Sequence, residues 1–240
     1  MITQSEVALL KLRELILSGT YPPGSHLMEV PLAQEMKISR TPVRAALGAL
    51  AQEGLLKYTP KSGFIVRGFT VKEIVDAVSV RGRLESMACA LAASNGIGTE
   101  SLERLRANLQ RTEALSRTRI IQAEHVTRWC DLNGEFHQVL VAEAGNQTLS
   151  RFIQQVDSVP LAAARTVAAT FHNLKRIGEV IANSVTMHAL VLEAVEKRQP
   201  ERAEYLMREH VYQGQQGLQL YLERVAAGGS HIPVSKLISG

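Results

Sequence analysis

The sequence predicts a mainly α-helical protein, with an N-terminal winged helix-turn-helix followed by an all-α helical bundle. Up to residue 68, helical periodicity alternates with turn residues and two short β-prone runs, whereas after residue 70 only helical periodicity remains. Aromatic residues make up 5% of the 240, while Ala, Leu, Val and Glu recur, which suits helices better than a β-sandwich. We expect domains at 1–69 and 70–228 and a loose tail at 229–240.

Two helices are predicted before residue 38. Apolar residues recur at near-helical spacing in SEVALLKLRELILSG, residues 5–19, where the final glycine supplies a C-terminal stop. TYPPGSHL, residues 20–27, contains two prolines and a glycine and is typical of a loop. EVPLAQEM, residues 29–36, predicts a short helix, and KIS predicts the turn after it.

A third helix and a hairpin complete this part. Ser39 is predicted to cap the helix, and Pro42 falls in its first turn, where a missing N–H costs little. The apolar positions of the helix recur on one face: Val43, Leu47 and Leu50. LLKYT and FIVRG then predict two short strands, joined by the loop PKSG.

Long helices are predicted for the rest of the chain. Thr70 and Glu73 form a capping-box pattern that opens a helix running to about residue 94. Pro200 gives a clear helix start after a turn at Gln199. The later helices are expected at 100–117, 119–144, 147–164, 174–198 and 201–226, with a less regular break around 168–173.

Composition narrows the functional classes. At 45% hydrophobic and 21% charged residues, the chain has the composition of a globular protein. Cys89 and Cys130 lie far apart without a Cys-x-x-Cys pairing, which favours buried reduced thiols. No secretory signal and no run of about 18 apolar residues is present, so we expect a cytoplasmic protein without a membrane partner. Of the formal net charge of +4, the first 68 residues carry eight basic and five acidic groups, an excess of +3.

Two arginines suggest what the third helix contacts. Arg40 and Arg44 are four residues apart, so they share one face, opposite the apolar stripe. The N-terminal end of a recognition helix enters the major groove of DNA, where guanidinium groups bind guanine. Thr41, Lys61 and Gly63 are expected to support contacts to the DNA backbone. Two solvated surface arginines are the simpler alternative, but the preceding helix, the turn and the wing all favour DNA binding.

The region from residue 5 to residue 68 resembles the DNA-binding domain of the GntR family of bacterial transcription regulators. The resemblance depends on PPGSHL, LAQEM, SRTPVRAAL and EGLL, which are highly specific in combination. It implies that Arg40 and Arg44 contact DNA and that Gly63 lies near the minor groove. The sequence departs from the family at Val30, where relatives often carry an arginine, and at Lys37, which replaces a turn glycine.

Histidines in the second half form a pattern of their own. His188 and His210 are equally far from residue 199, so an antiparallel helical hairpin would bring them to the same height. Asn133 and His137 share one face of another helix. Three imidazoles and an oxygen from facing helices would form a transition-metal site with open positions. Ordinary core or surface histidines are the alternative, and the pattern alone leaves both open.

Residues 70–226 resemble the all-helical FCD ligand-binding domain of the FadR subfamily, with a helix number closer to its VanR-like variant. The motifs are VRGRLESMACALAA, NGEFHQVLVAEAGNQTL and HALVLEAVEKRQPERAEYLMREH. The resemblance implies a divalent transition metal, with Zn²⁺ expected and Ni²⁺ or Mn²⁺ as alternatives, and these ligands: Asn133, His137, His188 and His210. Asn133 replaces the usual Asp, so we expect a weaker and more positive metal site that favours an anionic effector.

Arg81 is a candidate for binding that effector. A guanidinium that points inward could bind a ligand carboxylate with two parallel hydrogen bonds. An ion pair with Glu85, four residues further along the same helix, is the simpler alternative, and the sequence favours it.

Together these features predict a homodimeric transcription regulator that is not an enzyme. Two winged domains would bind an operator with an inverted repeat, because a two-fold dimer requires a two-fold site. A small organic acid at the metal would change DNA binding, with repression as the working expectation and activation left open. The alternatives are a metal-free regulator of a larger or fatty ligand and a metal-dependent enzyme fused to a DNA-binding domain. No acidic residue beside the histidines is spaced as an evident general base, which counts against the enzyme.

Overall fold

The computed structural model describes residues 3–60, 62–118, 120–159, 162 and 174–226. The chain forms two compact units. The N-terminal unit contains the residues up to Ile74, and the helical unit contains Val75–Asp157 and Leu161–Tyr221.

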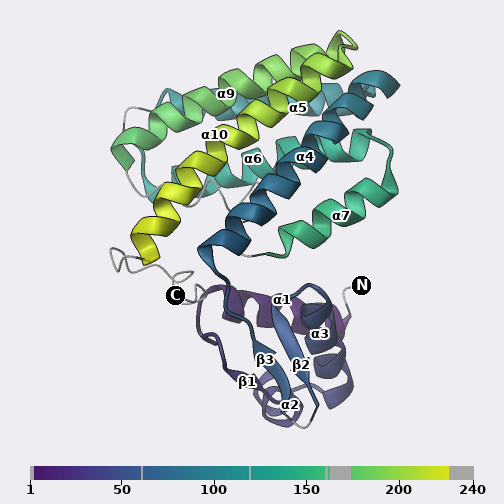
Figure 1. Cartoon of the computed structure of the whole chain (residues 1–240), viewed down its shortest axis with the longest axis vertical. Coiled ribbons are helices and arrows are strands. Elements are labelled where there is room, and N and C mark those ends of the chain that lie inside the picture. The colour runs from purple at the N-terminus through teal and green to yellow at the C-terminus, as the bar shows by residue number, and fades with distance from the viewer. Residues whose placement is uncertain (1–2, 61, 119, 160–161, 163–173, 227–240) are drawn as a thin grey trace. The chain divides into compact units, whose positions relative to one another are not determined.

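The N-terminal unit is a winged helix-turn-helix, as the sequence predicts (Figure 1). Its helices are α1 (Gln4–Leu17), α2 (Glu29–Met36) and α3 (Arg40–Gln52). Its strands are β1 (His26–Leu27), β2 (Leu56–Thr59) and β3 (Gly63–Val66), which pair antiparallel in the order β1-β3-β2. α1 packs against α3, and fully buried residues on both helices form the core: Leu12, Ile16, Leu47 and Leu50.

Local signals explain how α1 begins and how α2 ends. Thr3 and Glu6 form a reciprocal capping box at the start of α1. Lys37 ends α2 in the left-handed region, with a φ of 55°, a conformation that the usual glycine adopts at lower cost. Ser39 occupies the predicted N-cap position of α3, but its side chain makes no capping hydrogen bond there.

The loop predicted at residues 20–27 was wrong at its last two residues. His26 and Leu27 form β1, in which Leu27 pairs with Phe64 and His26 with Ile65 of β3. A two-residue strand is too short to show an alternating pattern in the sequence. It forms because the free edge of β3 offers backbone groups to pair with.

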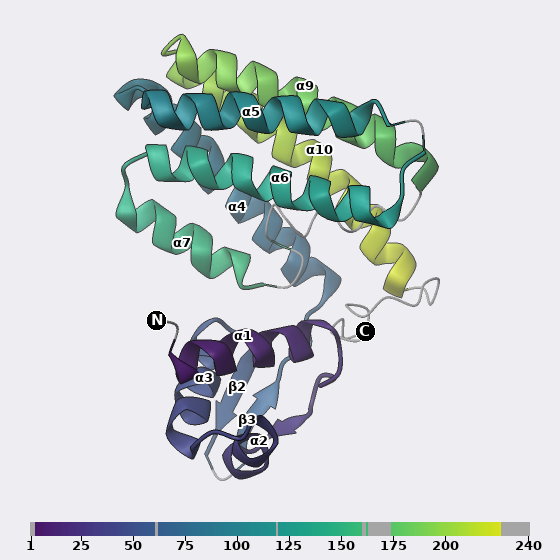
Figure 2. The ribbon, with the colours of Figure 1, turned by 180° about the vertical axis from the view of Figure 1, so that it is seen from behind.

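The helical unit is a bundle, seen from behind in Figure 2. Its helices are α4 (Val71–Asn95), α5 (Thr99–Ser116), α6 (Ala123–Glu143), α7 (Gln147–Asp157), α9 (Leu174–Glu196) and α10 (Pro200–Ala226). α5 packs against α6 and α9. α4 and α10 approach closely at Gly82, where an added Cβ would lie 2.7 Å from Cγ1 of Val211. The predicted capping box of α4 is present, since the Thr70 and Glu73 side chains bind each other's backbone N–H.

Two predicted helix bounds were wrong. The helix expected from residue 119 begins at Ala123, since residues 121–122 are not helical and Gln122 caps the helix. The helix expected over 147–164 ends at Asp157, and a turn and a bend follow. The remaining predicted residues 160–161 and 163–164, the break at 168–173 and the tail at 229–240 lie outside the described residues.

Cys89 and Cys130 are both buried, as the sequence predicts, and neither belongs to a disulfide among the described residues. Among the helices that the structure describes, none is both long and apolar enough to span a lipid bilayer.

Candidate DNA interface and histidine centre

The exposed face of α3 carries Arg40 and Arg44. Their side chains are 67% and 74% exposed, whereas Val43 and Leu47 on the opposite face are fully buried. Thr41, in the first turn of the helix, is exposed beside them. The two arginines therefore take no part in the core, and the leading end of α3 presents them outward.

Glu29 contacts both arginines, a relationship that the sequence analysis missed. Its Oε2 accepts a hydrogen bond from Nη2 of Arg40 at 3.3 Å, and its Oε1 lies 3.6 Å from Nε of Arg44. Glu29 is the first residue of α2 and Arg40 is the first residue of α3, so the contact joins the N-terminal ends of the two helices. No local pattern signals this contact, because the turn between the helices sets the distance.

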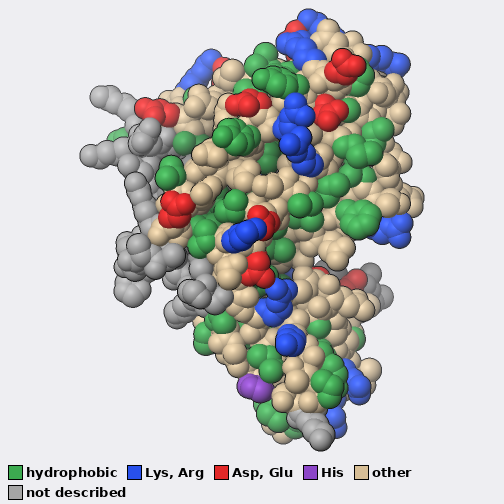
Figure 3. Space-filling view, viewed as in Figure 1, with side chains coloured by type: hydrophobic (Ala, Val, Ile, Leu, Met, Phe, Trp, Pro, Cys, Tyr) green, Lys and Arg blue, Asp and Glu red, His purple; other side chains and the backbone are tan. Residues whose placement is uncertain are grey.

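Of the two wing residues predicted to contact the DNA backbone, Lys61 and Gly63, the structure describes Gly63. Gly63 opens β3 with a φ of 76°, a backbone conformation that favours glycine. An added Cβ would lie 4.0 Å from the backbone oxygen of Leu27, so conformation rather than space selects glycine. Lys61 lies outside the described residues. On the face drawn in Figure 3, Lys and Arg side chains recur over the N-terminal unit.

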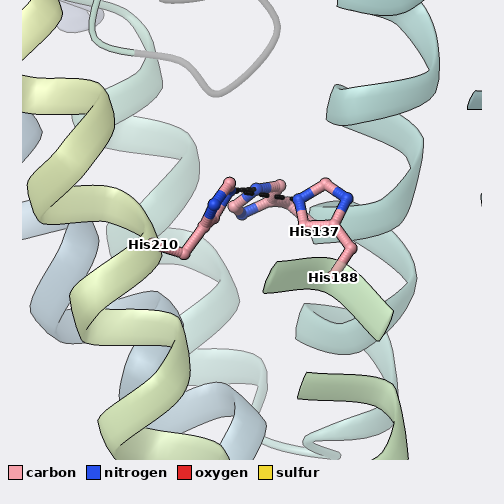
Figure 4. A group of neighbouring side chains, drawn as sticks. All are labelled: His137, His188 and His210. Atoms are coloured by element: carbon pink, nitrogen blue, oxygen red, sulfur yellow. Dashed lines mark hydrogen bonds between the residues drawn. The ribbon is translucent and has the colours of Figure 1, made fainter. Parts of the chain in front are cut away.

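Three histidines meet in the helical unit. His137 on α6, His188 on α9 and His210 on α10 point their rings toward one another (Figure 4). Nε2 of His210 is 3.0 Å from Nε2 of His188 and 3.3 Å from Nε2 of His137. One potential ligand atom from each residue lies within 4.8 Å of the others. The equal spacing of His188 and His210 about residue 199 thus correctly predicted that these two rings face each other.

These three side chains fit a metal ion. Burial and the neighbouring histidines lower the pKa of His210 to about 3 and that of His188 well below 6.5, so both rings are neutral near pH 7. A neutral imidazole has one N–H, so three converging Nε2 atoms cannot all satisfy one another. A cation that accepts one lone pair from each ring would satisfy all three Nε2 atoms. The Nε2–Nε2 distances of 3.0 and 3.3 Å suit bonds of about 2.0–2.1 Å from the nitrogens to one ion.

Neighbouring side chains hold these rings in place. The ring of Phe136 stacks on His188 with 3.9 Å between centroids and 4° between planes. Oε2 of Glu85 lies 3.0 Å from Nδ1 of His137, and a carboxylate at this nitrogen favours the tautomer that keeps its proton on Nδ1 and leaves Nε2 free to bind a metal. Glu85 therefore belongs to the site, although the sequence analysis considered it only as a partner of Arg81.

Arg81 is buried beside this group. Its Nε lies 3.4 Å from Oε2 of Glu85, as the simpler sequence interpretation expects, and its Nη1 donates to the backbone oxygen of Ala162. Burial alone would raise the pKa of Glu85, but the charges of Arg81 and the histidines outweigh it and hold the pKa at about 2. Glu85 is therefore ionised near pH 7.

Asn133 lies one turn before His137 on α6 and is 8% exposed. Its Oδ1 accepts a hydrogen bond from Ser184 of α9 at 3.5 Å. The structure thus groups the three histidines directly, and it places Asn133 on the same face of the neighbouring turn. Its role as a fourth ligand stays a prediction.

Asp157, at the end of α7, is a further acidic group that the sequence analysis missed. Burial raises its pKa to about 6, with a further increase from Glu85 and opposing effects of Arg81 and His137. Asp157 therefore interacts electrostatically with Glu85 and His137. No motif in the sequence indicates this interaction, because Asp157 lies at a helix end outside the conspicuous patterns.

Known proteins with similar sequences are transcription regulators. The chain is 30% identical over 149 residues to an uncharacterized HTH-type transcriptional regulator, YdhC, of Bacillus subtilis, a match over 62% of this chain and 64% of that protein. It is 28% identical over 199 residues to a probable D-xylose utilization operon transcriptional repressor of Paenarthrobacter nicotinovorans, covering 82% of this chain and 80% of the repressor.

The structure resembles that of E. coli McbR/YncC, with a TM-score of 0.64, 22% identity, and coverage of 91% of this chain and 98% of the other. This similarity supports the fold. Residues 4–66 match the gntR family of bacterial regulatory proteins, and residues 76–213, more than half of the chain, match the FCD domain. The chain therefore belongs to the GntR family of bacterial regulatory proteins and carries an FCD domain behind its winged helix-turn-helix.

Proposed function

We propose that this protein is a DNA-binding transcription regulator that acts as a homodimer on an operator with an inverted repeat. The observation that carries the proposal is the outward presentation of Arg40 and Arg44 from the leading end of α3. Arg40 and Arg44 read base edges in the major groove. Thr41 and the wing residues Lys61 and Gly63 support contacts to the sugar-phosphate backbone. Because its ligand is operator DNA, the regulator works in the cytoplasm, with repression as the working expectation.

The helical unit holds a divalent transition metal on the rings of His137, His188 and His210, with the carbonyl oxygen of Asn133 as fourth donor. Nitrogen and oxygen donors suit Zn²⁺, which we expect, and also Ni²⁺ and Mn²⁺. A bound metal supplies open coordination positions for a carboxylate oxygen. The convergence of the three rings, with His137 and His188 buried and His210 half-buried, supports this assignment.

The effector is a small organic acid. The buried guanidinium of Arg81, 3% exposed, gives the centre a fixed positive charge, although Glu85 neutralises part of it. A ligand carboxylate that displaces this pairing would gain a charge-assisted hydrogen bond from Arg81. Effector binding changes operator affinity only if the acid binds the DNA-bound and free arrangements unequally.

Two measurements test the proposal. Selection of duplexes from a random pool should yield an inverted repeat, and a non-symmetric consensus would contradict the dimeric reading. Metal content is then compared between the unaltered protein and the His137→Ala/His188→Ala double variant. His125→Ala, on the same α6 but away from the centre, serves as the control. Equal metal content in all three proteins would contradict the ligand set.

The effector is sought among mono-, di- and tricarboxylic acids. A member of this panel should raise the melting temperature of the zinc-loaded protein and change its affinity for the selected duplex. The same acid should have no effect after treatment with EDTA. An equal effect with and without EDTA would favour the metal-free alternative. The regulators among its relatives favour regulation over catalysis.

A further inference from the structure

We propose that Glu29 is a specificity-determining residue, which bridges the two DNA-reading arginines and keeps the protein from binding DNA of any sequence. The inference rests on the proposed reading of bases by Arg40 and Arg44. Its starting point is a carboxylate that serves both guanidiniums at once, with one oxygen on each.

The geometry of the bridge leaves the arginines able to read bases. Oε1 of Glu29 lies 3.6 Å from Nε of Arg44, too far for a hydrogen bond, so both Nη groups of that guanidinium are left to form the fork that matches O6 and N7 of guanine. Glu29 engages only Nη2 of Arg40, which leaves the other donors of that side chain for DNA. The carboxylate therefore fixes how the guanidiniums stand relative to each other without covering their reading ends.

The bridge is suited to orientation rather than to stability. Both arginines are mostly exposed, at 67% and 74%, and the contacts are 3.3 and 3.6 Å long, so the ion pairs add little to folding. The Glu29 side chain, in contrast, is only 23% exposed and stands in the first turn of α2, where the helix dipole stabilises a negative charge. The less mobile partner is thus the acid, and the two cations are positioned by it.

The bridge also reduces the attraction between this surface and phosphate. Two guanidiniums and one carboxylate give a net charge of +1 to the surface that is proposed to enter the major groove. Binding that does not depend on sequence comes almost entirely from cations that neutralise phosphates and release counterions. An acid between the reading arginines therefore weakens binding to every duplex, whereas correct bases recover the loss through hydrogen bonds to oriented guanidiniums.

Three variants separate charge from geometry. Glu29→Gln removes the charge and keeps the size of the side chain. Glu29→Asp keeps the charge, but it is one methylene shorter and cannot bridge both arginines in the same way. Glu35→Gln removes the same charge from an exposed position of the same helix, where the partner is Tyr21 rather than an arginine of α3. All are made in the full-length chain, and their melting temperatures show whether each is folded.

Each protein is titrated with two duplexes, one selected from a random pool by the unaltered chain and one shuffled from it. For Glu29→Gln we expect up to roughly eightfold tighter binding of the shuffled duplex at 0.1 M salt, and a steeper salt dependence by about 0.9 in log–log slope. Its preference for the selected duplex should fall. Glu29→Asp should keep the weak shuffled binding but lose base preference at the positions that Arg40 and Arg44 read. Glu35→Gln should keep the preference of the unaltered chain.

Equal effects of Glu29→Gln and Glu35→Gln on both duplexes would overturn the proposal, because only overall charge would then matter. Unchanged base preferences in Glu29→Asp would overturn the orienting role. Arg40→Ala and Arg44→Ala complete the set. If these two variants keep full preference for the selected duplex, the proposed DNA reading itself fails, and that result is distinct from a failure at Glu29.

Discussion

The carboxylate of Glu85 lies 3.0 Å from Nδ1 of His137, and the same oxygen lies 3.4 Å from Nε of Arg81. All three side chains are at most 4% exposed. A carboxylate in this position can orient the ring of His137, a proposed metal ligand, and Arg81 favours the ionised form of that carboxylate.

Glu85→Gln should lower the metal affinity of the protein by roughly 10- to 100-fold, because the amide orients His137 less strongly and increases its basicity less. The affinity is measured by competition with a coloured chelator. The temperature is kept well below the melting temperature, because the variant leaves the buried Arg81 without its charged partner Glu85 and is expected to be less stable. Glu135→Gln, on α6 in ion pairs with Arg104 and Arg111, is the matched control. Equal affinities for the two variants would remove Glu85 from the site.

Arg44→Ala should cost about 1–3 kcal/mol of binding free energy for the selected duplex and relax the preference at one base pair, because a base contact is lost. Lys11→Ala removes an exposed cation from α1 of the same unit and serves as the control. It should leave the base preferences intact. Fluorescence titration against single-mismatch duplexes measures both effects, and a uniform loss across all duplexes would assign Arg44 to phosphate instead.

The metal-free protein should lose stability on acidification below pH 6.5. Burial holds the pKa of His188 well below 6.5 and that of His210 at about 3, so between these values the unfolded chain binds more protons than the folded one. Each histidine then lowers the free energy of unfolding by about 1.4 kcal/mol per pH unit. Asp157 acts in the opposite direction between pH 6 and 3.8, because its folded pKa is raised to about 6.

Two histidines therefore outweigh one aspartate, and the net loss just below pH 6 is about 1.4 kcal/mol per pH unit. His210→Asn should remove most of this dependence. Urea unfolding of EDTA-treated protein from pH 7 to pH 5 measures it. An identical pH dependence in the variant would show that His210 is not buried as a neutral ring.

Gly82→Ala should lower the free energy of unfolding by about 1–2 kcal/mol, because the new Cβ would lie 2.7 Å from Val211 and force α4 and α10 apart. Gly178→Ala on α9, where no atom lies within 4 Å of an added Cβ, should instead raise it by about 0.5–1 kcal/mol. Chemical denaturation compares the two. If both variants are stabilised, the close approach of α4 and α10 is wrong.

Much of the fold follows from signals that act within a few residues. The capping box at Thr70, the stop after α2 at Lys37 and the start of α10 at Pro200 all appear where the sequence predicts them. Periodicity predicted the buried face of α3, and therefore also the exposed face that carries Arg40 and Arg44. The apposition of His188 and His210 was predictable because a tight turn joins two antiparallel helices. Residues at equal distances from that turn along the sequence lie side by side.

The sequence by itself determined the helices, the wing, the outward arginines and the histidine pair, since each depends on hydrogen bonds and apolar spacing within one element or one hairpin. Only the tertiary structure decided that β1 pairs with β3, that Glu85 of α4 contacts His137 of α6, and that Glu29 lies between both arginines. These contacts join different elements. Their distances depend on how helices pack and how turns direct them, and no spacing along the chain encodes that geometry.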